Sequence, residues 1–125
     1  MGGKKELINS EKLREIVVDG MKEKKAQNIV VMDLREVKNA IADFFIICTG
    51  TSETQIDAIS ESIEEFVYRF AGQEVWHREG KENKEWILLD FVDVVANIFK
   101  KNTREFYSLE ELWGDAKLID VETVY

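Results

Sequence analysis

The spacing of hydrophobic residues changes at Gly50, and this change marks the centre of the predicted fold. Asp43 to Cys48 is a short, almost continuous apolar run, which is typical of a strand buried on both faces. Beyond Gly50 the apolar residues recur every three or four positions, as on one face of a helix; they are Ile56, Ile59, Ile63, Phe66, Val67 and Phe70. We expect this strand and helix to form a βαβ unit with a further strand near Val75.

Polar residues and glycines indicate where two main helices begin and end. Ser52 and Gln55 have the spacing of a capping box, in which each side chain satisfies a backbone N–H group of the first turn. Gly72 ends that helix. An earlier helix begins at Asn9 or Ser10, which can cap it. Its inner face carries Leu13, Ile16, Val17 and Met21.

The other apolar segments have the length of strands. With Asp43–Cys48, they are Ile29–Leu34, Gln73–Arg78, Trp86–Phe91 and Val94–Phe99. The last two are so close in the chain that an antiparallel hairpin is expected. After them we expect a single helical turn, residues 109–113, and an extended tail.

These elements predict an α/β (α+β) fold, with one mixed sheet of about five strands and two main helices. No proline, repeat or low-complexity linker divides the chain. Residues 1–125 are therefore expected to form one domain, with an ordered core from about residue 10 to residue 116.

The first strand of the predicted hairpin is apolar on both sides. Because successive strand residues point to opposite faces, Trp86, Leu88 and Asp90 share one face, and the other face is apolar too. Two helices cover only part of such a sheet, so Trp86 and Leu88 could form an exposed patch for a partner. Alternatively, both faces are covered, by a helix on each side or by the tail through Tyr107 and Trp113.

Composition and charge exclude several classes of protein. The 125 residues include 45% hydrophobic and 34% charged residues, which favours a folded chain over a disordered one. A net charge of −8 argues against broad binding to nucleic acid phosphates. The acidic second half could attract a basic partner or simply maintain solubility.

Cysteine content and hydropathy narrow the cellular setting. Cys48 is the only cysteine, so a disulfide or a cysteine metal site is not expected. No segment has the roughly 20 apolar residues of a membrane span, and the first ten residues have no hydrophobic signal core. A cytoplasmic protein without a metal or cofactor is the expectation.

One turn has the composition of an anion-binding site. Gly50, Thr51 and Ser52 lie between a strand and a helix, where backbone N–H groups can hold a phosphate. Nucleotidyl-transferring enzymes use a comparable turn but also need two carboxylates, one residue apart, on the next strand. Gln73–Arg78 has no such pair, and His77 is the only histidine. A phosphate- or nucleotide-binding enzyme is therefore an alternative, and a turn that caps the helix is preferred.

Three long segments stand out along the chain: ADFFIICTGTS at residues 42–52, EWILLDFVDVV at residues 85–95, and REFYSLEELWGDA at residues 104–116. In this order they resemble successive signatures of the ribosomal silencing factor family RsfS, also called Iojap-like. The resemblance extends from about residue 10 to residue 116, and the order of the three segments makes it specific.

This resemblance implies a fold related to nucleotidyltransferases without their catalytic carboxylates, and a function without catalysis. Members bind large-subunit ribosomal protein fourteen on the face where the small subunit docks, and so block subunit joining and repress translation. The contact residues implied for this chain are Trp86, Leu88, Asp90, Asp93, Tyr107 and Trp113. An alternative is a homodimer in which the Trp86 face pairs with itself.

The chain departs from the family pattern at three positions. Val92 stands where many members have glycine, so the hairpin turn is expected to differ. Ala96 and Asn97 stand where Val-His is frequent, which removes a histidine from the expected contact surface. These changes are expected to adjust affinity without abolishing binding.

Overall fold

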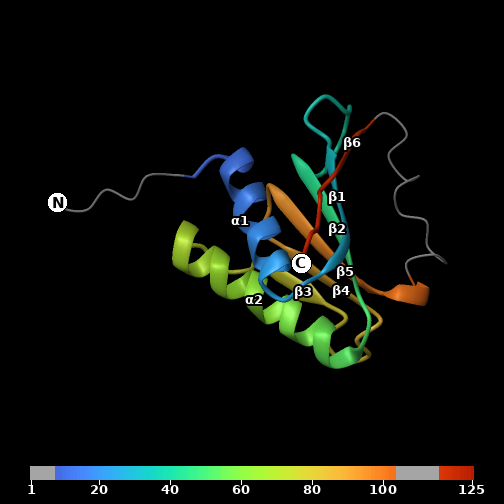
Figure 1. Cartoon of the computed structure of the whole chain (residues 1–125). Coiled ribbons are helices and arrows are strands. Elements are labelled where there is room, and N and C mark those ends of the chain that lie inside the picture. Colours follow the sequence, from blue (N-terminus) through green and yellow to red (C-terminus); the bar gives the residue numbers. More distant parts are fainter. Residues whose placement is uncertain (1–7, 104–115) are drawn as a thin grey trace.

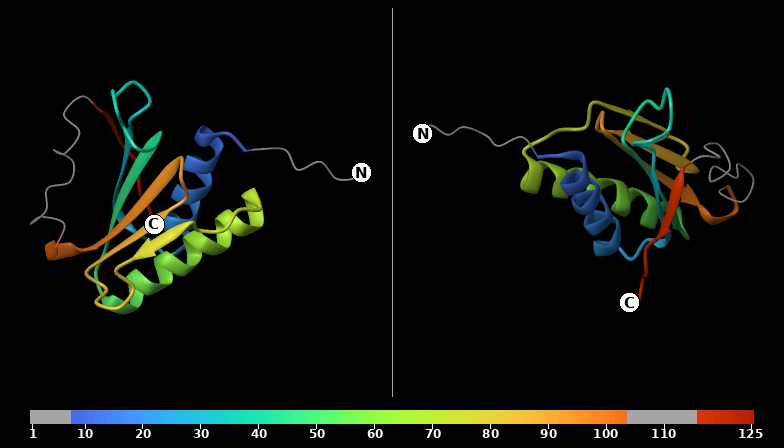
Figure 2. Two further views of the ribbon diagram at one scale, coloured as in Figure 1. Left: turned by 180° about the vertical axis from the view of Figure 1, so that it is seen from behind. Right: turned by 90° about the horizontal axis from the view of Figure 1, so that it is seen from above.

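One mixed sheet carries both helices on a single face. The computed structural model describes residues 8–103 and 116–125, and Figures 1 and 2 show the two helices together on one side of the sheet. The elements are α1 (Ser10–Glu23), β1 (Gln27–Asp33), β2 (Phe44–Gly50), α2 (Glu53–Ala71), β3 (His77–Glu79), β4 (Trp86–Asp90), β5 (Val94–Lys100) and β6 (Lys117–Asp120). The α/β class and the two main helices are confirmed, and the described part of the sheet has six strands instead of about five.

The strand order differs from the expected βαβ unit. The sheet runs β3-β4-β5-β2-β1-β6, and β2 pairs in parallel with β5, where Phe44 lies opposite Val94. Val75 lies outside β3, which is a three-residue edge strand antiparallel to β4. The prediction of a parallel strand near Val75 was therefore wrong. The strand beside β2 needs apolar residues on both faces, and β5 has six consecutive buried residues.

The sixth strand comes from the segment predicted to be an extended tail. β6 pairs antiparallel with β1, with Met32 opposite Leu118 and Asp33 opposite Lys117. All four β6 residues are exposed. A short edge strand with polar ends gives little hydrophobic signal, which is why the pattern alone predicted no strand here.

The predicted helix ends are confirmed. Asn9 Oδ1 accepts a hydrogen bond from the Lys12 backbone N–H at 2.8 Å, and Ser52 Oγ accepts one from Gln55 N–H at 3.1 Å. Gly72 follows α2 with a left-handed φ of 62°. That conformation, favourable for glycine, lets its N–H bond back to the last turn of α2.

The main core lies between the helices and the sheet. α1 and α2 pack so closely at Gly20 that a Cβ atom there would lie 2.9 Å from the Cα of Ile63. Four of the six apolar residues predicted on the inner face of α2 are buried: Ile56, Ile59, Ile63 and Val67. Phe66 is only half-buried and Phe70 is 52% exposed, because both line a groove of about 690 Å³ beside α1. The prediction that Phe70 is buried was therefore wrong.

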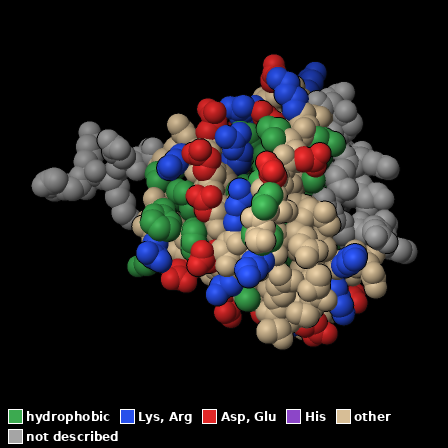
Figure 3. Space-filling view, in the orientation of Figure 1, with side chains coloured by type: hydrophobic (Ala, Val, Ile, Leu, Met, Phe, Trp, Pro, Cys, Tyr) green, Lys and Arg blue, Asp and Glu red, His purple; other side chains and the backbone are tan. Residues whose placement is uncertain are grey.

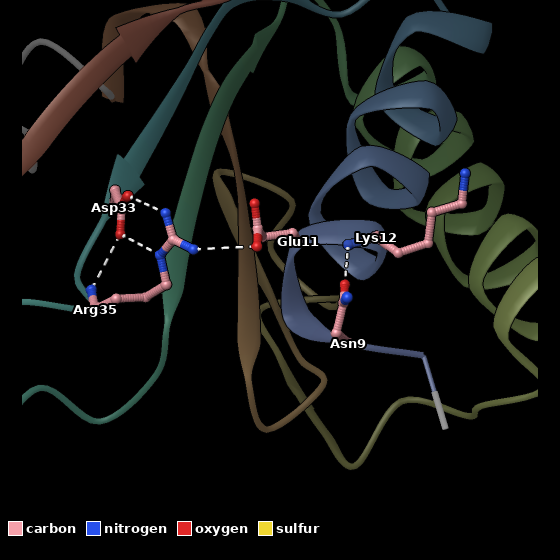
Figure 4. Close-up of polar contacts among 5 residues, drawn as sticks. All are labelled: Asn9, Glu11, Lys12, Asp33 and Arg35. Atoms are coloured by element: carbon pink, nitrogen blue, oxygen red, sulfur yellow. Dashed lines mark hydrogen bonds and ion pairs between the residues drawn. The ribbon is translucent and has the colours of Figure 1, made fainter. Parts of the chain in front are cut away.

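A charged cluster connects the end of β1 to α1 (Figure 4). The Arg35 guanidinium donates two hydrogen bonds to the Asp33 carboxylate, at 3.0 and 2.8 Å, and lies 3.4 Å from a carboxylate oxygen of Glu11. The same guanidinium lies 4.9 Å from the centre of the buried Phe44 ring. Its hydrogen bonds lower the pKa of Asp33 below its ordinary value.

Candidate functional site

The sheet face that turns away from both helices holds the predicted partner-binding residues of β4. We call it the outer face. Its buried members form a second apolar cluster, separate from the main core: Val30, Met32, Leu34, Phe45, Ile47, Val95 and Phe99. Val37, Ala40 and Ala42, from the connection between β1 and β2, pack against this cluster. The alternative of a helix on each face is wrong for α1 and α2, because both pack on the other side.

The alternation predicted for β4 is confirmed. Ile87 and Leu89 are fully buried on the helix side, whereas Trp86, Leu88 and Asp90 are half-buried on the outer face. The indole of Trp86 is therefore neither sealed in the core nor fully exposed. An amphipathic aromatic side chain in this position can contact a partner while it keeps its packing contacts within the chain.

Two contacts support the Trp86 side chain. Its ring is stacked on Phe99, with 4.9 Å between ring centres and 23° between ring planes. Its indole N–H donates a hydrogen bond to Oδ1 of Asn97 at 3.0 Å. The resemblance noted in the sequence showed only that position 97 lacks the histidine frequent in the family. The hydrogen bond between Asn97 and Trp86 was therefore not predicted. A polar residue within the apolar run Val94–Phe99 was the available signal.

Asp90 and Asp93 shape the turn between β4 and β5. An oxygen of the Asp90 carboxylate accepts the Val92 N–H at 2.7 Å. The Asp93 carbonyl accepts N–H groups of Asp43 and Phe44, at 2.8 and 3.1 Å, which fixes the turn against the start of β2. The Asp93 residue is otherwise exposed. Both residues therefore have structural contacts beside any role in binding.

The edge strand β3 extends the outer face beyond Asp90. His77 lies opposite Asp90 in the register, and Glu79 lies opposite Leu88. The two side chains approach each other at 3.3 Å between His77 Nε2 and Glu79 Oε2. Arg78 points the other way and binds the Glu64 carboxylate of α2 at 2.6 and 3.1 Å. His77 lies within the predicted strand Gln73–Arg78, but no sequence pattern showed that this strand pairs with β4. His77 and Glu79 were therefore not identified as part of this face.

The remaining predicted contact residues lie outside the part of the chain that the structure describes. These are Tyr107 and Trp113, together with the expected helical turn at residues 109–113. Their roles stay predictions.

Polar groups of the turn at Gly50–Ser52 already form hydrogen bonds within the chain. The side-chain oxygen of Gln55 accepts hydrogen bonds from the Thr51 N–H at 2.7 Å and from the Thr51 hydroxyl at 3.0 Å. A Cβ atom on Gly50 would lie 2.8 Å from Ile56 Cγ1, so close packing accounts for the glycine. Gln55 thus bonds Thr51 and not Ser52, unlike an ordinary capping box. These contacts favour a helix-capping role, and anion binding there stays a prediction.

Potential metal ligands and surface charges are spread over the part of the chain that the structure describes. Within these residues, no group of three or more His, Cys, Asp or Glu side chains is placed to hold a metal ion. Figure 3 shows acidic and basic side chains interleaved over the face that carries α1. Neither α1 nor α2 is long and apolar enough to cross a bilayer.

Comparison with known proteins identifies the family. The family model described as ribosomal silencing factor during starvation, RsfS, matches residues 8–125. The chain belongs to the RsfS family. A ribosomal silencing factor RsfS from Halalkalibacterium halodurans is 38% identical over 117 residues, which cover 94% of this chain and 98% of the relative.

Two further RsfS-like proteins extend the comparison. The chloroplastic Iojap protein of Zea mays is 44% identical over 78 residues, which cover 62% of this chain and 33% of that protein. A crystal structure of a Chromobacterium violaceum protein superimposes with a TM-score of 0.81 at 25% identity, covering 94% of this chain and 97% of that one. The RsfS family and the α/β fold expected from the sequence are thus confirmed, and the family name supports a role in ribosome silencing and translation repression.

Proposed function

We propose that this RsfS-family protein binds the large ribosomal subunit through its outer face and thereby prevents the small subunit from joining. The partner on the large subunit is ribosomal protein fourteen, the target implied by the sequence motifs. The protein acts by occupying a surface and not by catalysis. The location we propose for it is the cytoplasm, as expected from the sequence.

The half-buried indole of Trp86 is the observation that carries this proposal. Trp86 and Leu88 present apolar area beside the Asp90 carboxylate on one face of β4. Protein interfaces commonly have a central aromatic anchor surrounded by polar groups. Carboxylates at the rim suit a basic partner and increase the rate of encounter.

Replacing the anchor tests the proposal directly. Trp86→Ala is expected to weaken binding to isolated large subunits by more than ~2 kcal/mol, the range of hot-spot aromatic residues. Co-sedimentation with large subunits measures binding, and adding small subunits then measures joining. Wild-type protein should prevent joining, and Trp86→Ala should permit it.

Phe70→Ala is the control for loss of an exposed aromatic side chain. Phe70 lies on the helical side of the molecule and is 52% exposed, so its removal should leave binding unchanged. A folded Trp86→Ala protein that binds like wild type would contradict the proposal. A Trp86→Ala protein that does not fold would place Trp86 in the core and not in the interface.

Light scattering of the free protein tests the homodimer. A dimer that Trp86→Ala separates into monomers would mean that two copies use the outer face when no ribosome is present.

Binding of the purified ribosomal protein fourteen, compared with ribosomal RNA alone, tests which component of the large subunit is the partner.

A further inference from the structure

Asn97 is a buried polar side chain on an otherwise apolar part of the outer face. It lies in the middle of β5, opposite Leu88 in the register, and has no exposed surface. Val95 and Phe99, its neighbours on the same face of β5, are apolar and buried as well. An amide in such a place destabilises the fold unless its polar atoms are hydrogen-bonded.

The hydrogen bonds of Asn97 leave its amide only one orientation. Oδ1 accepts the Trp86 indole N–H at 3.0 Å, and Nδ2 donates to the backbone carbonyl of Ile46 at 3.4 Å. An indole can only donate and a carbonyl can only accept, so the reverse orientation would lose both bonds. The amide therefore connects the indole to the backbone of β2, the neighbouring strand.

Asn97 and Phe99 constrain the indole in different ways. Stacking on Phe99 sets the plane of the ring, but a stacked ring can still rotate within that plane or slide over its neighbour. The bond to Asn97 sets the direction of the N–H edge. Together the two contacts hold one orientation of a side chain that remains partly exposed.

We propose that Asn97 is a positioning residue that holds Trp86 in the orientation needed to bind the large ribosomal subunit. This inference rests on the proposed function, and it identifies Asn97 as the residue that orients Trp86 before the partner binds. An anchor that is already ordered loses less rotational freedom on binding than a mobile one. Asn97 itself, being buried, does not touch the partner.

Asn97→Leu tests this role, because leucine has a similar volume and cannot accept a hydrogen bond. We expect about 10-fold weaker binding to large subunits, or ~1.4 kcal/mol, with Trp86 still present. The Trp86 indole N–H resonance should shift in ¹H–¹⁵N spectra and exchange faster with solvent. A purely structural role for Asn97 would lower the melting temperature without changing the affinity of the folded fraction.

Two comparisons separate positioning from general damage. Ile98→Val alters the next residue of β5, which is buried on the helix side, and should leave affinity and the indole resonance unchanged. In a Trp86→Phe background, which lacks the N–H donor, Asn97→Leu should add little further loss of binding. Additive losses from the two changes would overturn the proposal, since the residues would then act independently.

The outcomes distinguish this inference from the proposed function. If Trp86→Ala abolishes binding and Asn97→Leu does not weaken it, Asn97 does not position the anchor, whereas the proposed function survives. If wild-type protein does not bind large subunits, both fail. If Asn97→Leu does not fold, Asn97→Thr replaces it; threonine suits a strand, its hydroxyl is too short to reach the indole, and the same loss of affinity is expected.

Discussion

At the scale of single residues, Val92 combines an unfavourable backbone with a structurally useful position. Its φ of 76° lies in the left-handed region, which branched side chains rarely adopt. The Asp93 N–H bonds to the Phe91 carbonyl across Val92 at 3.0 Å, which closes a three-residue turn. Val92 therefore has a backbone conformation that glycine adopts easily, and the expectation that this turn differs from that of glycine-containing members stays a prediction.

Val92→Gly should therefore stabilise the protein by about 1 kcal/mol, because glycine adopts a positive φ without steric strain. Urea denaturation monitored by circular dichroism measures the change. Val124→Gly is the matched control; Val124 is 82% exposed and has no positive φ, so its replacement should give no gain. Equal or lower stability of Val92→Gly would show that the turn is not strained.

At the scale of elements, the contact between α1 and α2 depends on Gly20. In a sequence pattern this glycine only weakens a helix, but in the structure it lets the backbones approach closely. The hydroxyl of Ser62 also donates a hydrogen bond to the Gly20 carbonyl at 2.8 Å. The glycine thus contributes to helix packing and not to flexibility.

Gly20→Ala has two opposing effects on stability, and their magnitudes decide whether the protein gains or loses stability. Alanine raises helix propensity by about 1 kcal/mol, but overpacking against a backbone atom costs about 1–3 kcal/mol. We expect a net loss of about 1 kcal/mol in the free energy of unfolding, measured by thermal or urea denaturation. A more stable Gly20→Ala protein would mean that the helices can separate without cost.

Local patterns predicted elements better than they predicted pairing. Each helix has its capping residue, Asn9 or Ser52, within a few positions of its first periodic apolar residues, so both helices could be recognised. The pairing of β2 with β5 joins residues about 50 positions apart, and no local pattern encodes it. The bond between Asn97 and Trp86 was missed for a similar reason, because a polar residue in an apolar run does not identify its partner.

At the scale of the whole molecule, the Asp33 cluster makes stability depend on pH. The Asp33 side chain is only 11% exposed, and the Arg35 guanidinium lowers its pKa by hydrogen bonding to the charged carboxylate. A carboxyl group whose pKa is lower in the folded state stabilises the fold above its unfolded pKa of about 3.9. That stabilisation is lost as the pH falls through the folded value.

Asp33→Asn should accordingly lower stability by about 1 kcal/mol at pH 7, and the difference from wild type should disappear as the pH falls below about 4. Urea denaturation at several pH values measures it. Glu15→Gln removes an exposed carboxylate that lies 3.8 Å from Lys12, and it should change little at any pH. A difference for Asp33→Asn that persists unchanged in acid would show that charge is not its cause.

The pairing of β6 with β1 has a consequence for synthesis of the protein. β1 is made early, yet one of its edges acquires its partner only after residues 117–120 have left the translating ribosome. Until then the backbone N–H and C=O groups on that edge of β1 have no strand to pair with, and β1 strands of neighbouring nascent chains could pair with each other there. A factor that acts on ribosomes therefore completes its own sheet only after its β6 residues have left one.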